Sequence, residues 1–394
     1  MLDQLALLEY VYMADKIHET IIIGAGIAGL ACARKLHENG KGFLVISEDI
    51  GGSITTSEDG RVNYGAQYVN KDFHNVNKFV KVGRKIGPKD LLFHEADDAY
   101  TFALWEKRVY LNLLELARLM LLLVKFRKHY EAFKKKCEFI SQSNALRSDK
   151  FLWDLYNQNA TDFAIKHKLN KIVKHYASKT LRALSLQFQD INSFTFLQWS
   201  LPLIMPLYEF TLQKEKMVDG FEKNITIDTV IQIVGEKGGA LVRTKKQQYY
   251  SKNVVVATPP HISKELLNLR GIKAPTSAHL FHISGRLREA YNARDINLFS
   301  EGHPLFTIDR QIDGSYIYYT SERKPKFDKY FHEYKVMGYK EWSPVFNVKG
   351  SFLWECEQDR GLYLIGNHNI LSLEDPFIMG IYAANRIIEE SRKR

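Results

Sequence analysis

The sequence is poor in cysteine and contains no low-complexity segment. Its three cysteines, Cys32, Cys137 and Cys356, are odd in number and have no C-x-x-C spacing, so they suggest neither a disulfide framework nor a zinc site. We therefore expect no metal and a reducing, cytoplasmic location. Lys and Arg number 55 against 45 Asp and Glu, a net charge of +10, but no lysine-rich tail or dense basic arm is present. Nucleic acid is accordingly not an expected partner.

The first residues lack the marks of a secretory signal. The run MLDQLALLEYVY is apolar, but it carries an acid instead of a basic start, and no small-residue cleavage site follows it. We interpret residues 1–15 as an N-terminal extension. Whether translation starts at Met1 or at Met13 is a question that the sequence leaves open.

Beyond the extension, the sequence predicts a strand, a glycine turn, a helix and a second strand within about thirty residues. Residues 20–23 (TIII) are typical of a strand buried on both faces, residues 27–39 have helical periodicity before Gly40, and residues 43–46 form the next apolar run. With 45% hydrophobic residues, the 394-residue chain has enough apolar material for two domains.

The glycine turn predicts a dinucleotide site. Gly24 allows the tight turn, Gly26 lets a pyrophosphate approach the backbone, and Gly29 permits close packing of helix on strand. Ile27 and Ala28 would then present the amides of the helix N-terminus to the phosphates. The alternative is a chance glycine-rich turn, and the motif alone does not separate NAD from FAD.

The acidic residue that should bind the adenosine ribose is displaced. Ser47 occupies the expected position at the end of the second strand, and Glu48 follows it. Glu48 reaches the ribose if the strand ends one residue later. The alternative is that Glu48 is a solvated loop acid.

The residues after the second strand point to a flavin. Gly51-Gly52-Ser53 is followed by TTSEDG and then by RVNYGAQYV, which contains Gly65, Ala66 and Gln67. This pattern resembles the FAD-binding amino-terminal segment of the flavin amine oxidase superfamily, which includes protoporphyrinogen oxidase and the phytoene desaturases. The resemblance implies that these residues lie along the cofactor. Ser53 stands where relatives usually have an arginine.

Two later blocks extend the resemblance to about 160 residues. The segment TVIQIVGEKGGALVRT…VVVATPP is similar to a strand pair in which the backbone of Val230 would contact the adenine, with Thr258 at the end of the returning strand. The segment GLYLIGNHNILSLEDPFIMG resembles the closing motif of the family. That motif implies cofactor contacts from a further set of residues: Gly366, Asn367, Glu374, Asp375 and Phe377.

The closing motif also has a physical interpretation. Asp375-Pro376 is a favourable helix start, which predicts an N-cap at Asp375 and a helix over residues 377–390. The positive end of that helix, near Glu374 and Asp375, would stabilise negative charge on a reduced flavin. The alternative is a helix that only packs Ile378, Ile381 and Ile387 on the sheet.

The resemblance implies hydride transfer from an organic substrate to noncovalent FAD, which is then reoxidised by oxygen or another acceptor. Cys356 does not match the linking cysteine of covalent relatives. Trp342 and Ser372 are the candidates beside the flavin, and Ser372 replaces a cage aromatic of the amine-oxidising relatives, which favours a largely apolar substrate. A small-amine oxidase, an NAD(P)-linked dehydrogenase and a non-catalytic nucleotide-binding or membrane-docking protein are the alternatives. His279 and His282 are interpreted as pocket or core residues.

Residues 100–210 have almost no glycine and predict a mostly helical insertion. Within it, residues 111–126 form a wide apolar helix with a narrow polar stripe, followed by a run of basic residues up to position 136. Such a helix could lie on an anionic membrane, which makes peripheral membrane contact through 111–136 one interpretation. The other is a helix buried against its neighbours with a solvated basic tail.

Together these patterns predict an α/β fold in which two domains interleave. The first is a Rossmann-like FAD-binding domain, with a parallel sheet, helices and a β-meander, built from residues 16–95, 214–265 and 345–394. The second is a mixed α+β substrate-binding domain built from residues 96–213 and 266–344.

Overall fold

The computed structural model describes residues 16–95, 99–103, 107, 111–236, 238–270, 277–342 and 353–393. The expected N-terminal extension, residues 1–15, lies outside the described residues, as does the domain boundary expected at residue 345.

The first sheet has eight strands and a parallel centre in the order β17-β18-β11-β1-β2-β8. The glycine turn does not end β1, because its pairing with β2 continues to Ala25 and Gly26, opposite Ile50 and Gly51. Strands β9 and β10 form the expected meander and join the sheet at β11. The strands are β1 (Lys16–Gly26), β2 (Leu44–Gly51), β8 (Ile225–Ile227), β9 (Val230–Glu236), β10 (Gly239–Thr244), β11 (Gln248–Val256), β17 (Glu357–Asp359) and β18 (Leu362–Leu364).

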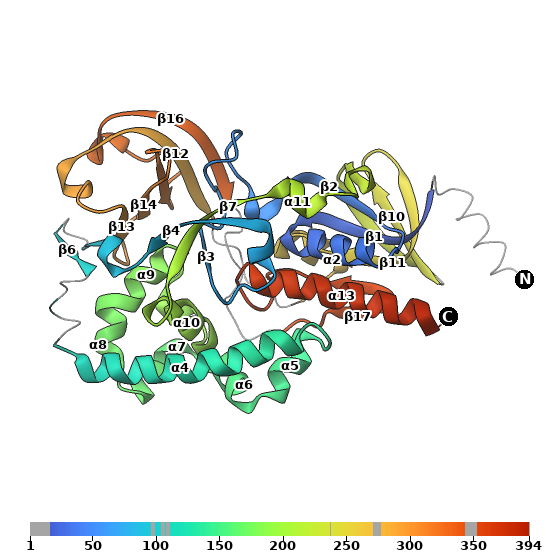
Figure 1. The fold of residues 1–394 in the computed structure, drawn as a ribbon, viewed down its shortest axis with the longest axis horizontal. Helices are drawn as coiled ribbons and strands as arrows, with labels where there is room; N and C mark the ends of the chain where they lie inside the picture. Colours follow the sequence, from blue (N-terminus) through green and yellow to red (C-terminus); the bar gives the residue numbers. More distant parts are fainter. Residues whose placement is uncertain are drawn as a thin grey trace, which may run out of the picture.

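Both faces of this sheet are covered, which explains the β-branched runs in its central strands. Helices α2 (Ile27–Glu38) and α13 (Glu374–Lys393) lie side by side on one face (Figure 1) and share a core with Ile22, Val45 and Val255. The other face packs against the meander and α12 (Pro260–Leu267). A short helix, α11 (Lys214–Val218), lies beyond α2.

A second sheet of seven strands has the order β16-β12-β15-β14-β13-β5-β6, and a separate three-stranded sheet has the order β3-β7-β4. The seven strands are β5 (Leu91–His94), β6 (Tyr100–Phe102), β12 (Ala278–Leu287), β13 (Ile296–Phe299), β14 (Leu305–Arg310), β15 (Tyr316–Thr320) and β16 (Phe331–Trp342). The three are β3 (Tyr68–Asn70), β4 (Val80–Ile86) and β7 (Leu207–Leu212).

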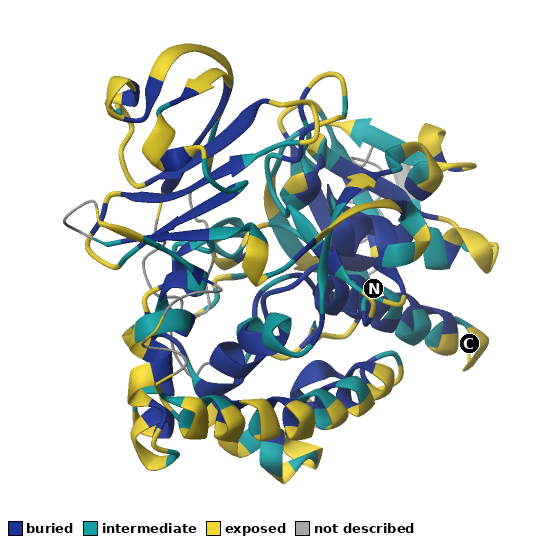
Figure 2. Cartoon of the chain, turned by 60° about the vertical axis from the view of Figure 1, so that its left-hand side comes forward, coloured by how far each residue is buried: buried dark blue, intermediate teal, exposed yellow. Residues whose placement is uncertain are grey.

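The predicted helical insertion is confirmed. Its longest helix is α4 (Leu113–Lys136), whose inner side joins a core of its own with the shorter helices (Figure 1). Figure 2 shows the outer side of α4, along the lower edge of the molecule, as largely exposed. The shorter helices are α5 (Gln142–Ser148), α6 (Lys150–Asn157), α7 (Ala160–Lys166), α8 (Asn170–Ile172), α9 (Ser178–Arg182) and α10 (Ser193–Ser200).

The expected fold class, a Rossmann-like parallel sheet joined to a separate mixed substructure, is confirmed. The start of the last helix is corrected: α13 begins at Glu374, and the residue that caps it is Ser372 instead of Asp375, because the Ser372 hydroxyl accepts from the Asp375 amide at 2.8 Å. The proposed domain bounds stay a prediction. Among the described residues, no helix combines the length and the apolar character needed to cross a bilayer.

Candidate functional site

The glycines of the first turn have two different roles. Gly24 has a φ of +108°, and a Cβ at this position would lie 2.7 Å from the carbonyl oxygen of Ala257, so the chain itself requires glycine there. A Cβ on Gly26 would meet only the Gly52 Cα, at 3.9 Å. Because the protein leaves room for a side chain at Gly26, its glycine is better explained by the approach of a ligand.

The N-terminus of α2, directly after Gly26, lacks a cap from the chain. No side chain of the described residues bonds the cap position, and no acid lies in the first turn. The first amides of a helix need partners, and phosphate oxygens are suitable ones. Helix α13 packs directly against this first turn of α2. The contact is so close that a Cβ on Gly380 would overlap the carbonyl oxygen of Ala28.

The second and third glycine segments converge on the same point. Gly51 pairs with Gly26 in the β1–β2 register, and a Cβ on Gly52 would lie 3.1 Å from the Gly26 Cα. The segment that contains Gln67 is held against them, because the Ala66 amide donates to the Ser53 carbonyl at 3.0 Å. The structure therefore brings together three motifs that the sequence places up to forty residues apart.

Ser47 and Glu48 lie in the middle of β2, which continues to Gly51 instead of ending at either candidate, and they adjoin the residues that lead into β9. The Ser47 hydroxyl donates to the Asp49 carbonyl at 2.7 Å. Glu48 is exposed, and its Oε1 accepts from the Thr229 hydroxyl at 3.0 Å, next to Val230. Of the two candidates, Glu48 thus keeps a carboxylate oxygen directed at solvent beside the expected adenine contact.

The Glu374 and Asp375 carboxylates have partners within the protein. Glu374 accepts hydrogen bonds of 2.9 to 3.0 Å from the Asn75 amide, the Asn75 side chain and the Val76 amide. Asp375 accepts from the Tyr130 and Ser372 hydroxyls, both at 2.5 Å. Burial raises the pKa of both carboxyl groups. The two acids that were expected to face a flavin therefore bind the protein itself. Glu374 binds Asn75 and the start of η2 (Val76–Phe79), and Asp375 binds α4.

The rest of the closing motif is also buried. Asn367 accepts from the Ser372 amide through its side-chain oxygen at 3.3 Å, and the Phe377 ring stacks on Phe79 at 5.7 Å. Gly366 has a φ of +131° and lies against the ring of His368.

Sequence reasoning missed His368 and Ser263, which connect this motif to Thr258. The His368 Nε2 lies 3.1 Å from the Ser263 hydroxyl, which is 2.8 Å from the Thr258 hydroxyl. The His368 Nδ1 has no hydrogen-bond partner among the described residues, and burial lowers the pKa of this side chain to about 3. A lone histidine in an apolar segment gives no signal of this role, because Ser263 is over a hundred residues away.

The candidate flavin neighbours Trp342 and Ser372 lie in different surroundings. The Trp342 Nε1 donates to the Tyr64 carbonyl at 3.1 Å, which places the indole beside the Gly65–Gln67 segment. Ser372 is taken up by the Asp375 contacts. Each of the pair thus adjoins a different predicted cofactor segment: Trp342 lies beside the Gly65–Gln67 segment, and Ser372 lies within the closing motif.

Tyr64 begins a hydrogen-bonded chain that sequence analysis did not predict. Its hydroxyl lies 3.1 Å from the His282 Nδ1, and the His282 Nε2 lies 2.8 Å from the Ser315 hydroxyl. Ser315 in turn donates to Asp313 at 2.5 Å, in the turn between β14 and β15. Burial lowers the pKa of His282, which favours its neutral imidazole.

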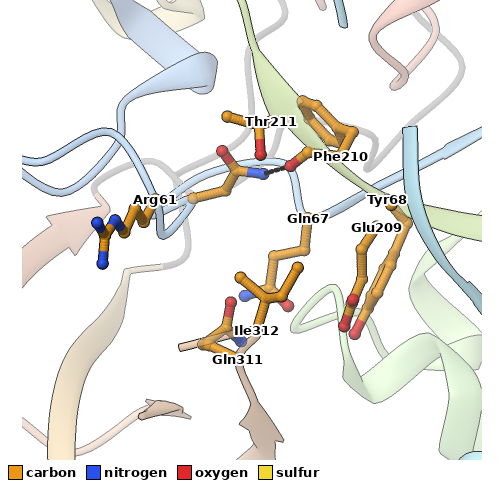
Figure 3. Close-up of a pocket in the computed structure, with 10 residues that line it drawn as sticks. Arg61, Gln67, Tyr68, Glu209, Phe210, Thr211, Gln311 and Ile312 are labelled. Carbon is orange, nitrogen blue, oxygen red and sulfur yellow. Dashed lines mark hydrogen bonds between the residues drawn. The ribbon is translucent and has the colours of Figure 1, made fainter. Parts of the chain in front are cut away.

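A pocket opens beside Gln67, between the three-stranded sheet and the β14–β15 turn (Figure 3). It encloses about 430 Å³, part of which is open solvent. In Figure 3 the Gln67 side chain points into the space between Ile312 and the Tyr68 and Glu209 side chains. Glu209 forms an ion pair with Arg84 at 2.7 Å, and Arg84 also contacts Asp295. The remaining lining residues are Arg61, Asn63, Gly83, Phe210, Thr211 and Gln311.

A metal role has no structural support within the described ranges, where no group of three or more His, Cys, Asp or Glu side chains could hold a metal ion. Cys356 is buried in the core that α2 and α13 share with the sheet, and burial raises the pKa of its thiol.

Comparison with known proteins supports a dinucleotide-binding fold. Residues 22–81 match the family model of an NAD(P)-binding Rossmann-like domain. No curated protein matches the sequence.

Solved structures are similar over nearly the whole chain. A wild-type putrescine oxidase bound to putrescine has a TM-score of 0.66 at 11% identity, covering 95% of this chain and 99% of its own. Cyclohexylamine oxidase from Brevibacterium oxydans has a TM-score of 0.60 at 14% identity, covering 95% and 99%. A protein assigned as a protoporphyrinogen oxidase, from Exiguobacterium sp., has a TM-score of 0.59 at 11% identity, covering 97% and 100%. The chain therefore has a flavin amine oxidase-like fold.

Proposed function

We propose that the chain is an FAD-dependent oxidoreductase that oxidises or desaturates an organic substrate by hydride transfer to noncovalently bound flavin. The observation that carries this proposal is the uncapped N-terminus of α2 over Gly26, where the protein leaves space that its own packing does not use. The similar folds of two amine oxidases support the same cofactor. Bound FAD would supply the hydride acceptor, and the chain would bind, orient and shield it.

The residues present fit the nucleotide half of FAD. The first amides of α2 would hold the diphosphate, with Gly26 and Gly52 leaving the backbone accessible. Glu48 is the acid best placed for the ribose, beside Val230. Near the ring, Glu374 and Asp375 keep α13 and α4 in position through their own hydrogen bonds instead of offering carboxylates to the flavin.

The pocket beside Gln67 favours a substrate that forms hydrogen bonds. Its described walls combine amide, hydroxyl, carboxylate and guanidinium groups with the apolar surfaces of Tyr68, Phe210 and Ile312. This lining supports a small polar substrate, such as an amine, over the largely apolar substrate that Ser372 suggested.

Tyr64 and its partners are proposed to move the proton that accompanies hydride loss. Oxidation of a C–H bond next to an O–H or N–H group releases a proton as well as a hydride. The Tyr64 hydroxyl would take that proton while giving its own to His282 Nδ1, and Ser315 and Asp313 would carry charge to the β14–β15 turn. Neutral His282 is the form that can accept.

Purified protein tests the cofactor directly. We expect a yellow protein whose denatured supernatant contains FAD by mass spectrometry, and whose flavin absorbance bleaches anaerobically with an oxidisable substrate. Putrescine, cyclohexylamine and a porphyrinogen form a first substrate panel. Well-folded protein that is colourless and takes up no FAD at micromolar concentration would refute the proposal. FAD that binds but never bleaches would favour the non-catalytic alternative, and bound NAD(P) would favour the dehydrogenase.

A further inference from the structure

The outer face of α4 is apolar over its first half. Five side chains on it, of residues that helical spacing places on one side, are 42–74% exposed: Leu113, Leu114, Met120, Leu121 and Val124. The opposite side of the same helix, including Leu119, Leu123 and Phe126, is fully buried among the other helices. The helix thus has a complete core-facing side and a second apolar side with no partner among the described residues.

Both acids of α4 have partners within the protein. Glu115 accepts from the backbone amides of Lys171 and Ile172 at 2.8 and 3.0 Å, so it caps α8. Glu131 contacts His74 at 3.1 Å and Lys134 at 2.6 Å. Glu131 stays partly exposed, but it is paired with His74 and Lys134, so neither acid of α4 is without a partner.

Five of the cations of α4, in contrast, lie on the solvent side, whereas Lys134 is buried and Arg127 pairs with Asp72. The exposed basic residues are Arg118, Lys125, Lys128, Lys135 and Lys136. They flank the apolar row and continue beyond it toward the C-terminal end of the helix. The outer face thus joins exposed apolar side chains to positive charge without compensating negative charge.

We propose that this face docks α4 parallel to the surface of an anionic lipid bilayer. The apolar row would enter the boundary between headgroups and acyl chains, and the cations would attract anionic headgroups. Charge selects this occupant over a second copy of the chain, since a symmetric dimer through α4 would bring two sets of cations together. The inference does not depend on the bound cofactor, because every contact belongs to α4 and its neighbours.

Vesicle binding by the full-length protein tests the proposal. We expect flotation with vesicles of phosphatidylcholine and phosphatidylserine, little flotation with phosphatidylcholine alone, and release by high salt. The triple variant Leu114→Ser, Leu121→Ser, Val124→Ser should reduce partitioning about 100-fold, and Lys125→Glu with Lys128→Glu about 10-fold or more. Matched controls of equal chemistry elsewhere, Met337→Ser on β16 and Lys324→Glu with Lys326→Glu, should leave partitioning unchanged.

A fluorescent label identifies the face that enters the bilayer. All three native cysteines are buried, so an environment-sensitive dye attached to Leu121→Cys should report on α4 alone. A blue shift with anionic vesicles, absent from a label at Met337→Cys, is the expected result. Failure to bind anionic vesicles, equal binding by the triple variant with an unchanged melting temperature, or a salt-stable dimer that the triple variant abolishes would each overturn the proposal.

Discussion

Helices α2 and α13 lie side by side on one face of the same sheet, but only the N-terminus of α13 is hydrogen-bonded by side chains of the protein. The first turn of α2 has no capping side chain and no acid. It follows Gly26, where the protein leaves room for a side chain that glycine lacks. The first turn of α13 contains Glu374 and Asp375, which are buried and hydrogen-bonded to the chain itself. Two adjacent helix dipoles thus serve different purposes: one is available to an anion, and the other organises the protein.

The largest expected effect is at the α2 end. We predict that Gly26→Ala weakens FAD binding by 100- to 1,000-fold, about 3 to 4 kcal/mol, because its methyl group enters the diphosphate position. The melting temperature of the apoprotein should be nearly unchanged, since the new Cβ lies 3.9 Å from its nearest neighbour.

Gly29→Ala is the matched contrast. A Cβ at Gly29 would overlap the Gly24 carbonyl oxygen. The melting temperature of the Gly29→Ala apoprotein should therefore fall, unlike that of Gly26→Ala. FAD titration measures the affinity of each apoprotein, and thermal melts measure its stability. If Gly26→Ala binds FAD normally, the open helix end is not the cofactor site and the comparison fails.

The next effect is at the α13 end and should fall on stability. Asp375→Ala leaves the Tyr130 and Ser372 hydroxyls without their shared acceptor, so we expect the free energy of unfolding to drop by about 3 kcal/mol. Asp375→Asn keeps an acceptor of the same shape and removes a buried charge, and should retain most of the stability. Urea unfolding followed by circular dichroism measures both. A selective loss of FAD affinity without destabilisation would show that Asp375 faces the cofactor after all.

Much of the nucleotide end was predictable from sequence, and little of the α13 end was. Gly24, Gly26 and Gly52 signal their roles locally, because backbone geometry at a tight turn demands glycine. The partners of Glu374 are about 300 residues away at Asn75 and Val76, so no local pattern reveals that its carboxylate is occupied. Likewise, the S-x-x-D cap at Ser372 competes with the Asp375-Pro376 signal, and only tertiary contacts decide between them.

Helix α4 shows the same limit. Its sequence is apolar on most sides, so periodicity did not determine which side the other helices would cover. The burial of Leu119, Leu123 and Phe126 settles that point in the folded chain.

A smaller effect concerns how stability depends on pH through His368, in the closing motif before α13. His368 is neutral when folded, with a pKa near 3, and regains its ordinary value of 6.5 on unfolding. Its contribution to stability is therefore complete above pH 6.5 and is lost as the pH falls toward 3. We expect about 2.5 kcal/mol of stability to disappear between pH 7 and pH 4.5 and to be largely retained in His368→Gln.

The smallest expected change is at the ribose. Glu48→Gln should weaken FAD binding about 5-fold, roughly 1 kcal/mol, because a charge-assisted hydrogen bond becomes a neutral one. Ser47→Ala should have no effect, since its hydroxyl is bonded to the Asp49 carbonyl. Equilibrium titration of the apoprotein distinguishes the two. The reverse ranking would assign the ribose to Ser47.

The close contact of Gly380 with the first turn of α2 also sets an order of events during synthesis. Strand β18 and helix α13, from the last described segment, complete the sheet and the helix layer that β1 and α2 begin. Residues 16–95 thus leave the ribosome more than 250 residues before β18 and α13 can cover their apolar surfaces. During that interval the nascent Rossmann strands have exposed edges, so translation speed and chaperone access should influence how much of this protein reaches its native state.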